Sequence, residues 1–201
     1  ISHRIIILGS QAIGKSIVTN LLEGEDVLNT IAVMSELGAN IKKKDNKFII
    51  YGLPPGSLFQ PTKKLNFGNS GTGIRLIAGL VSSNNIEAVL FGDKSLNSRP
   101  MKRVTEHLSR IGSIIKLKNN LYPTINIKGV VNAIPLNFEV IIPSAQIKSS
   151  IILSSLNTNG LVKIKEFRST RDHTENMLKS MGYNIKVCLL YTSDAADDCV
   201  C

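Results

Sequence analysis

An internal repeat constrains the fold of this chain more than any single motif. In three segments a helical run closes on glycine and continues into alternating apolar residues: residues 35–41, 109–115 and 179–185. The glycines Gly38, Gly112 and Gly182 lie 74 and 70 residues apart. Glycine in this place is typical of a helix C-terminus, because the left-handed cap conformation costs it little. The spacing predicts three consecutive units that resemble one another.

A second helix is predicted upstream of each of these glycines. Each one starts near Ser or Asn, which are favourable N-cap residues, and then runs into apolar sequence. The starts lie at residues 2–4, 69–75 and 144–148, and each holds a cation: Arg4, Arg75 and Lys148. Strands are expected after these helices, at residues 17–19, 86–90 and 161–164, and after the glycines, at 47–51 and 124–127.

Units of this size cannot bury their apolar faces alone. We therefore predict an α/β (α+β) fold in which three units pack around a pseudo-threefold axis. That packing brings several helix N-termini to one side. Free N–H groups and the positive dipole end of each helix would attract phosphate or carboxylate there.

A phosphate-loop pattern near the start supports a competing hypothesis. Gly9-Ser-Gln-Ala-Ile-Gly14-Lys15-Ser16 matches G-x-x-x-x-G-K-S, which would make the chain a nucleotide-binding protein. That motif needs a strand before the loop and a helix that opens at the lysine. The repeat instead places Gly14 in a turn from a helix to a strand. We therefore expect Lys15 in an exposed turn, without a role in binding ATP.

The charge of the chain narrows the class of partner. It carries 24 Lys and Arg against 15 Asp and Glu, a formal net charge of +9. Nucleic-acid binding favours basic clusters with aromatic residues for stacking, but only 5% of residues are aromatic and Trp is absent. The basic run 42–44 is expected at a solvated strand edge. We therefore expect no nucleic-acid partner. Phosphorylated small molecules remain as candidate ligands for a positively charged chain.

The two ends of the chain suggest its extent and location. No apolar stretch reaches the roughly 20 residues of a membrane span, and no secretory leader is visible, so we expect a cytoplasmic protein without a membrane partner. The missing Met suggests that the natural N-terminus lies upstream. Residues 187–201 hold all three cysteines, Cys188, Cys199 and Cys201, and resemble translated sequencing-adaptor sequence. Cys199 and Cys201 are too close for the usual zinc spacing, so we expect a non-native tail and no metal.

Several separated motifs, in order, resemble the 5-enolpyruvylshikimate-3-phosphate synthase family. They are Ile1-Ser-His-Arg4, Leu21-Leu-Glu-Gly-Glu-Asp-Val27, Gly68-Asn-Ser-Gly-Thr72 with Arg75, Gly92-Asp93 with Arg99-Pro-Met101, Pro143-Ser-Ala-Gln146 with Lys148, and Arg171-Asp-His-Thr-Glu175. The resemblance covers residues 1–186. It implies one lobe of the enolpyruvyl transferase fold, built of three βαβαββ-type units, incomplete at its N-terminus and without its second lobe.

The resemblance also implies an activity. Members transfer the enolpyruvyl group of phosphoenolpyruvate to the 5-hydroxyl of shikimate 3-phosphate and release phosphate, without a metal or organic cofactor. The catalytic acid and base are expected in the missing lobe, and a substrate-binding lysine before Ile1. We therefore expect this chain alone to be inactive and the full-length protein to be a monomeric enzyme of aromatic amino-acid biosynthesis.

Eight residues match positions that bind substrates in the family. Arg4, Arg171, Ser144 and the backbone of Ala145 would hold shikimate 3-phosphate, and Gln146 would lie between both substrates. Gly71, Thr72 and Arg99 would lie against phosphoenolpyruvate. A glycine permits close approach of the ligand, and the planar fork of arginine suits carboxylate or phosphate.

Other residues are assigned no binding role. Arg75 is interpreted as an ion-pair partner between helices. His173 and Glu175 are only two positions apart on a predicted helix and face different ways, so they are interpreted as structural. His3 and His107 have no partner in sight.

Two further functions remain open from the sequence. The enolpyruvyl transferase of cell-wall synthesis shares the fold and uses a UDP-sugar, but it typically has a loop cysteine, which the body of this chain lacks. The other is a phosphate-binding module without enzymatic activity.

Overall fold

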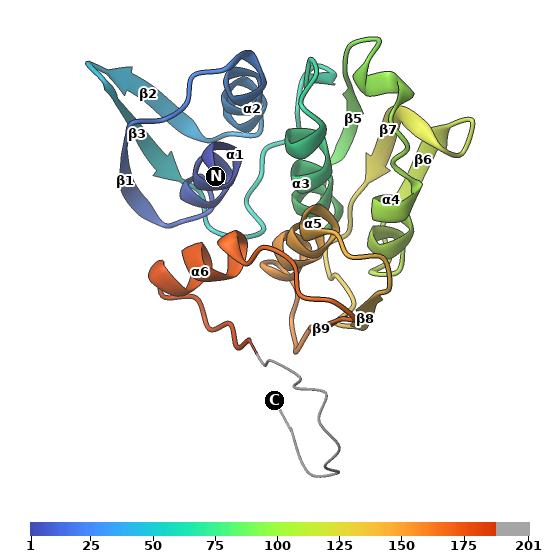
Figure 1. Ribbon diagram of the computed structural model, residues 1–201. Helices are drawn as coiled ribbons and strands as arrows, with labels where there is room; N and C mark the ends of the chain where they lie inside the picture. Colours follow the sequence, from blue (N-terminus) through green and yellow to red (C-terminus); the bar gives the residue numbers. More distant parts are fainter. Residues whose placement is uncertain (188–201) are drawn as a thin grey trace.

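Helices and strands alternate in three consecutive groups (Figure 1) in the computed structural model, which describes residues 1–187. The first group is α1 (Ser2–Gly9), β1 (Gly14–Thr19), α2 (Glu25–Glu36), β2 (Asn40–Lys44) and β3 (Lys47–Gly52). The second is β4 (Leu65–Asn66), α3 (Gly71–Ser82), β5 (Glu87–Phe91), the short 3-10 helix η1 (Leu96–Ser98), α4 (Lys102–Ser109), β6 (Ile114–Lys118) and β7 (Tyr122–Lys128). The third is β8 (Asn137–Val140), α5 (Ala145–Ser155), β9 (Lys163–Glu166) and α6 (His173–Ser180). The α/β class is confirmed.

Each group forms its own sheet. The strand orders are β1-β3-β2, β4-β5-β7-β6 and β8-β9. The pairs β1–β3, β2–β3, β5–β7 and β6–β7 are antiparallel, whereas β4–β5 and β8–β9 are parallel across the helices α3 and α5. Helix, strand, helix and hairpin thus follow one another in the same order in the first two groups, and the third begins in the same way. The pseudo-threefold axis stays a prediction.

The repeat glycines end three helices, as the sequence predicted. Gly38, Gly112 and Gly182 follow α2, α4 and α6 with φ angles of 103°, 104° and 83°. These angles lie in the left-handed region that only glycine adopts readily, so each glycine closes its helix and turns the chain toward the next segment.

The core lies where the helices of the three groups meet, with the sheets toward the outside of the molecule (Figure 1). Helix α3 packs directly on α5. A Cβ added to Gly79 would overlap the carbonyl oxygen of Ser150, and the Ser150 hydroxyl donates to the carbonyl of Arg75 at 2.9 Å. Large buried side chains such as Ile74, Leu76 and Ile77 fill the space around this contact. The two helices therefore meet along a seam with no spare room.

The structure contradicts the phosphate-loop alternative. The motif requires a strand before its loop, but helix α1 leads into it and ends at its first residue, Gly9, and strand β1 begins at Gly14, where the motif requires a helix. Lys15 is exposed as expected, but it lies within β1 and pairs with Tyr51 instead of lying in the turn. A strand at this place directs no helix N-terminus at a nucleotide, so nucleotide binding through residues 9–16 is wrong.

No helix in residues 1–187 is long and apolar enough to cross a membrane. In the same part of the chain, no three His, Cys, Asp or Glu side chains are grouped so as to hold a metal ion. The predicted tail, with its three cysteines, lies outside the described residues except for Val187.

Candidate functional site

The first turns of α3 and α5 lie against each other. Each helix is capped by a serine: the Ser70 hydroxyl accepts from the Gly73 N–H at 3.0 Å, and the Ser144 hydroxyl accepts from the Ile147 N–H at 3.4 Å. Between the two caps, Gln146 Nε2 donates to Thr72 Oγ1 at 2.9 Å. This contact joins two predicted site residues, although 74 positions separate them in the chain.

Two arginines lie beside this contact. Arg75 Nη1 donates to Gln146 Oε1 at 3.0 Å and to the Gly71 carbonyl at 3.1 Å. Arg99 Nη2 donates to Asn69 Oδ1 at 2.5 Å, and its Nη1 lies 3.0 Å from where a Cβ of Gly71 would be. Gly71, Thr72, Arg75, Arg99 and Gln146 are called the α3 cluster below.

No carboxylate pairs with either arginine of the α3 cluster in the described part of the chain. Burial lowers the pKa of Arg75, and the positive charge of Arg99 lowers it further. The interpretation of Arg75 as an ion-pair partner is therefore wrong. Nothing in the sequence indicates that the Arg75 guanidinium faces Gln146, although the spacing of four places Gly71 and Arg75 on one helix face.

Arg4 forms a second group of contacts on the other side of α5. Its Nε donates to Thr174 Oγ1 at 2.7 Å, and its Nη2 donates to Ser149 Oγ at 2.9 Å. The Ser149 hydroxyl hydrogen is donated to the Ala145 carbonyl, so Thr174 is the donor in the 2.8 Å contact between the two hydroxyls. Both hydroxyl oxygens thus accept from one guanidinium, which fixes its orientation.

Arg171 lies close enough to Arg4 to influence it. Burial lowers the pKa of Arg4, the charge of Arg171 lowers it further, and Glu175 opposes both. Arg171 itself is exposed. Arg4, Ser149, Arg171 and Thr174, called the α1 cluster below, thus bring two like charges together next to solvent.

A buried triad of ion-paired side chains lies next to the α1 cluster, on α5, β9 and α6. Lys148 Nζ lies 2.7 Å from Glu166 Oε2 and 2.7 Å from Glu175 Oε1, and these side chains are 8%, 14% and 6% exposed. Burial lowers the pKa of Lys148, but the two carboxylates outweigh it and raise the pKa overall. The ammonium therefore remains charged. Lys148, Glu166 and Glu175 are called the Lys148 triad.

The structure places the eight predicted residues around the N-terminal half of α5. Gly71, Thr72, Arg99 and Gln146 are in the α3 cluster, and Arg4 and Arg171 are in the α1 cluster. Ser144 and Ala145 form the start of the helix that contacts both. Glu175 is structural, as interpreted, through its pair with Lys148.

The expectation that His3 has no partner is wrong. Its Nε2 lies 3.0 Å from Asp26 Oδ2 and its Nδ1 lies 2.8 Å from Thr30 Oγ1, both on α2. Burial lowers the pKa of His3, against an opposing effect of Asp26. A neutral ring donates from Nε2–H to Asp26 and accepts at Nδ1 from the Thr30 hydroxyl only if that hydroxyl gives up its 3.1 Å hydrogen bond to the Asp26 carbonyl. His107 has an edge contact with the ring of Phe138.

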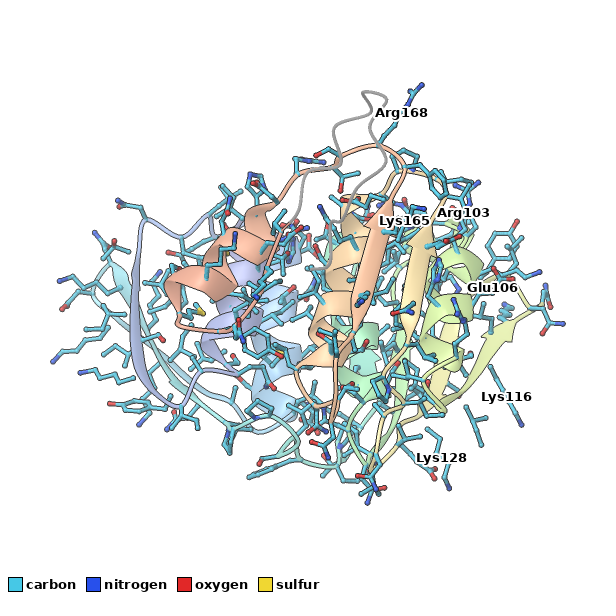
Figure 2. All side chains as sticks on the ribbon, turned by 90° about the horizontal axis from the view of Figure 1, so that it is seen from below. Arg103, Glu106, Lys116, Lys128, Lys165 and Arg168 are labelled. Carbon is cyan, nitrogen blue, oxygen red and sulfur yellow. The ribbon has the colours of Figure 1, made fainter. Side chains whose placement is uncertain are left out.

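Much of the remaining positive charge is spread over the surface. Figure 2 shows Arg103, Lys116, Lys128 and Lys165 projecting outward from different elements, without converging. Lys128 pairs with Glu87 at 2.7 Å. These residues form no compact basic site and agree with a solvated surface.

Comparison with known proteins identifies the family. The family model described as EPSP synthase (3-phosphoshikimate 1-carboxyvinyltransferase) matches residues 1–190. Two proteins named 3-phosphoshikimate 1-carboxyvinyltransferase are similar over 188 residues: that of Paramagnetospirillum magneticum is 43% identical, and that of Mesorhizobium japonicum 44%. Each alignment covers 93% of this chain and 42% of the relative. The chain therefore spans less than half the length of these relatives.

A solved structure shows the same arrangement of elements. The EPSP synthase of Acinetobacter baumannii superposes with a TM-score of 0.88 at 37% identity, over 92% of this chain and 42% of that one. The order of motifs, the fold and the family match agree over nearly all the described residues. The chain belongs to the EPSP synthase family.

Proposed function

We propose that this chain is part of an enzyme that transfers the enolpyruvyl group of phosphoenolpyruvate to the 5-hydroxyl of shikimate 3-phosphate. In that reaction the 5-hydroxyl loses its proton as its oxygen bonds to the central carbon of phosphoenolpyruvate, whose methylene group gains a proton and becomes a methyl group. The resulting ketal then loses one methyl proton and inorganic phosphate, which restores the double bond. The relatives carry the name of this reaction, which does not favour the UDP-sugar alternative.

One observation carries the proposal: two cationic clusters lie on either side of the first turns of α5. Both substrates of the reaction are anions, and each needs a cationic group. Arg171, together with the free N–H groups after Ser144, suits the phosphate of shikimate 3-phosphate, and Arg4 beside Arg171 suits the ring substituents of the same substrate. Arg99 suits phosphoenolpyruvate beside Gly71, whose missing side chain leaves room.

Gln146 connects the two proposed binding positions. Its amide is held by Arg75 and Thr72, so it cannot rotate freely. Holding two anions side by side is unfavourable unless the protein supplies compensating charge and fixed donors. This chain would supply them, whereas the proton-transferring groups would come from the rest of the protein. We expect that whole protein to be a monomer in the cytoplasm.

Binding to the 201-residue chain tests the proposal. We would follow a titration with shikimate 3-phosphate by heteronuclear NMR and compare Arg171→Ala with Arg103→Ala, which removes an exposed arginine of α4 (Figure 2). Arg171→Ala should weaken binding by about tenfold or more, as expected for hydrogen bonds to a charged group, and Arg103→Ala should not. Equal effects of the two variants, or shift changes scattered over the surface, would contradict the proposed site.

A further inference from the structure

We propose that Lys148 is a positioning residue of the anion site: through Glu166, Thr170 and Glu175 it holds the segment that carries Arg171 and Thr174. The inference rests on the proposed function and assigns a role to a residue that would not touch substrate. The ammonium group of Lys148 makes three contacts. Lys148 Nζ meets Glu166 at the end of β9, the Thr170 carbonyl at 3.4 Å and Glu175 on the first turn of α6.

These three contacts enclose a short stretch of chain. Between Glu166 and Glu175 lies a loop without regular structure up to the start of α6 at His173. Thr170 Oγ1 adds a 2.5 Å hydrogen bond to Glu166 Oε1. The loop is thus fastened at its beginning, near its middle and at its end, and two of the residues it presents are Arg171 and Thr174.

The α1 cluster depends on this segment. Thr174 accepts from Arg4 Nε and donates to Ser149, so a shift of the first turn of α6 would release the Arg4 guanidinium. Arg171 is exposed, and its side chain has no hydrogen bond among residues 1–187, so the backbone held at Thr170 sets where its Cα lies and which region its guanidinium can reach. The Lys148 triad therefore influences the positions of both Arg4 and Arg171 through the segment between Glu166 and Glu175.

Charge alone would act in the opposite direction. One ammonium and two carboxylates sum to a net charge of −1, which repels an incoming anion. If the triad influenced the site only electrostatically, its neutralisation would tighten anion binding. If it positions the loop, neutralisation weakens binding. The sign of the change separates the two roles.

Removing Lys148 alone would leave two carboxylates buried without a partner, which would destabilise the fold. The informative variant is therefore Lys148→Met/Glu166→Met/Glu175→Met, because replacement of a complete buried ion-pair triad by hydrophobic residues of similar volume often preserves stability. A matched control is Lys43→Met/Glu23→Gln, which neutralises an exposed 2.7 Å pair of the first sheet. Urea unfolding verifies that both variants fold.

The test is a double-mutant cycle on the 201-residue chain, with shikimate 3-phosphate and inorganic phosphate as separate NMR titrants. We expect the triad variant to bind about tenfold more weakly, the size of one lost hydrogen bond to a charged group, and the control to bind like the unmodified chain. In an Arg171→Ala background the triad variant should cost clearly less than in the unmodified chain, because only its effect on Arg4 through Thr174 remains. In an Arg99→Ala background its full effect should remain.

Tighter binding, unchanged binding, or additive effects with Arg171→Ala would overturn the positioning role. If inorganic phosphate reproduces the coupling but shikimate 3-phosphate gains nothing over it, the positioning role stands and the proposed function fails. If shikimate 3-phosphate binds at Arg4 and Arg171 but the triad variant binds equally well, the proposed function stands and this inference fails. Absence of binding by both titrants would overturn both.

Discussion

The α1 and α3 clusters hold the same kind of charge by different means. Arg4 lies near Glu175, and its guanidinium is oriented by two hydroxyl groups on α5 and α6. Arg75 and Arg99 are held by amide and carbonyl oxygens, and each raises the local positive potential for the other. Countercharge inside the protein therefore stabilises the fold at the α1 cluster. At the α3 cluster the countercharge is left for a ligand to supply.

The largest expected effect concerns this countercharge. Lys148→Ala should lower the free energy of unfolding by about 3–5 kcal/mol, because Glu166 and Glu175 would remain buried without a cation. Arg99→Ala, which breaks no ion pair, should change it by about 0.5 kcal/mol or less. Urea denaturation of both variants measures the difference. Similar losses would mean that the two clusters do not differ in how they support the fold.

Acid should destabilise the protein through His3 on α1, in addition to any contribution from His107 on α4, whose pKa is also lowered by burial. The pKa of His3 is lowered in the folded state from an ordinary value of 6.5, so the unfolded chain binds the proton more readily. Stability from the neutral ring is complete above that value and declines as the pH falls below it, until the lower folded pKa is passed. The slope is at most about 1.4 kcal/mol per pH unit for one proton.

His3→Gln should remove this part of the pH dependence, which unfolding curves between pH 7.5 and about 5.5 would show as a difference from the unmodified chain. An equal slope in His3→Gln would assign the dependence to other groups.

The α3 cluster can be given the countercharge that it lacks. In Gln146→Glu the new carboxylate would lie where Oε1 now accepts from Arg75, at 3.0 Å. We expect a gain of about 0.5–1 kcal/mol in unfolding free energy, together with weaker binding of phosphoenolpyruvate. Gln146→Ala is the control, because it removes the amide without adding charge. Unchanged affinity in the glutamate variant would show that ligands do not need the free charge of Arg75.

The smallest effect on stability is expected from Gly71→Ala. The added Cβ would lie 3.0 Å from Arg99 Nη1 and 3.1 Å from Arg75 Nη1, so both flexible side chains must shift. We expect unfolding to change by about 0.5 kcal/mol or less, since alanine also favours the helix. NMR signals of the Arg75 and Arg99 side chains should move, and that of Arg4 should not. A shift at Arg4 would mean that the two clusters are not independent.

The sequence predicted what depends on local chemistry. Gly38, Gly112 and Gly182 could be recognised because a helix end requires a residue that tolerates positive φ. The cap Ser144 could be recognised in the same way, whereas the second helix is capped by Ser70 and not by Asn69, where its start was expected, and α1 has no side-chain cap. The phosphate-loop pattern could be rejected because neighbouring secondary structure, and not the motif itself, determines its function.

What the sequence did not reveal depends on contacts between distant segments. Nothing near Lys148 indicates burial, because its partners Glu166 and Glu175 lie on other elements. The same holds for His3, whose ring is fixed by Asp26 and Thr30 on α2. Arg75 looked like a surface cation until α5 placed Gln146 beside it. The role of a charged residue depends on the residues that contact it, and these contacts cannot be identified from a single sequence.

The tight seam between Gly79 and Ser150 has a mechanical consequence. Helices that interlock without spare volume resist sliding, since a densely packed interior transmits displacement instead of absorbing it. A displacement of the first turn of α3 should therefore be transmitted almost completely to the first turn of α5. We expect α3 and α5 to move as one rigid unit, and the loops around them to be more flexible.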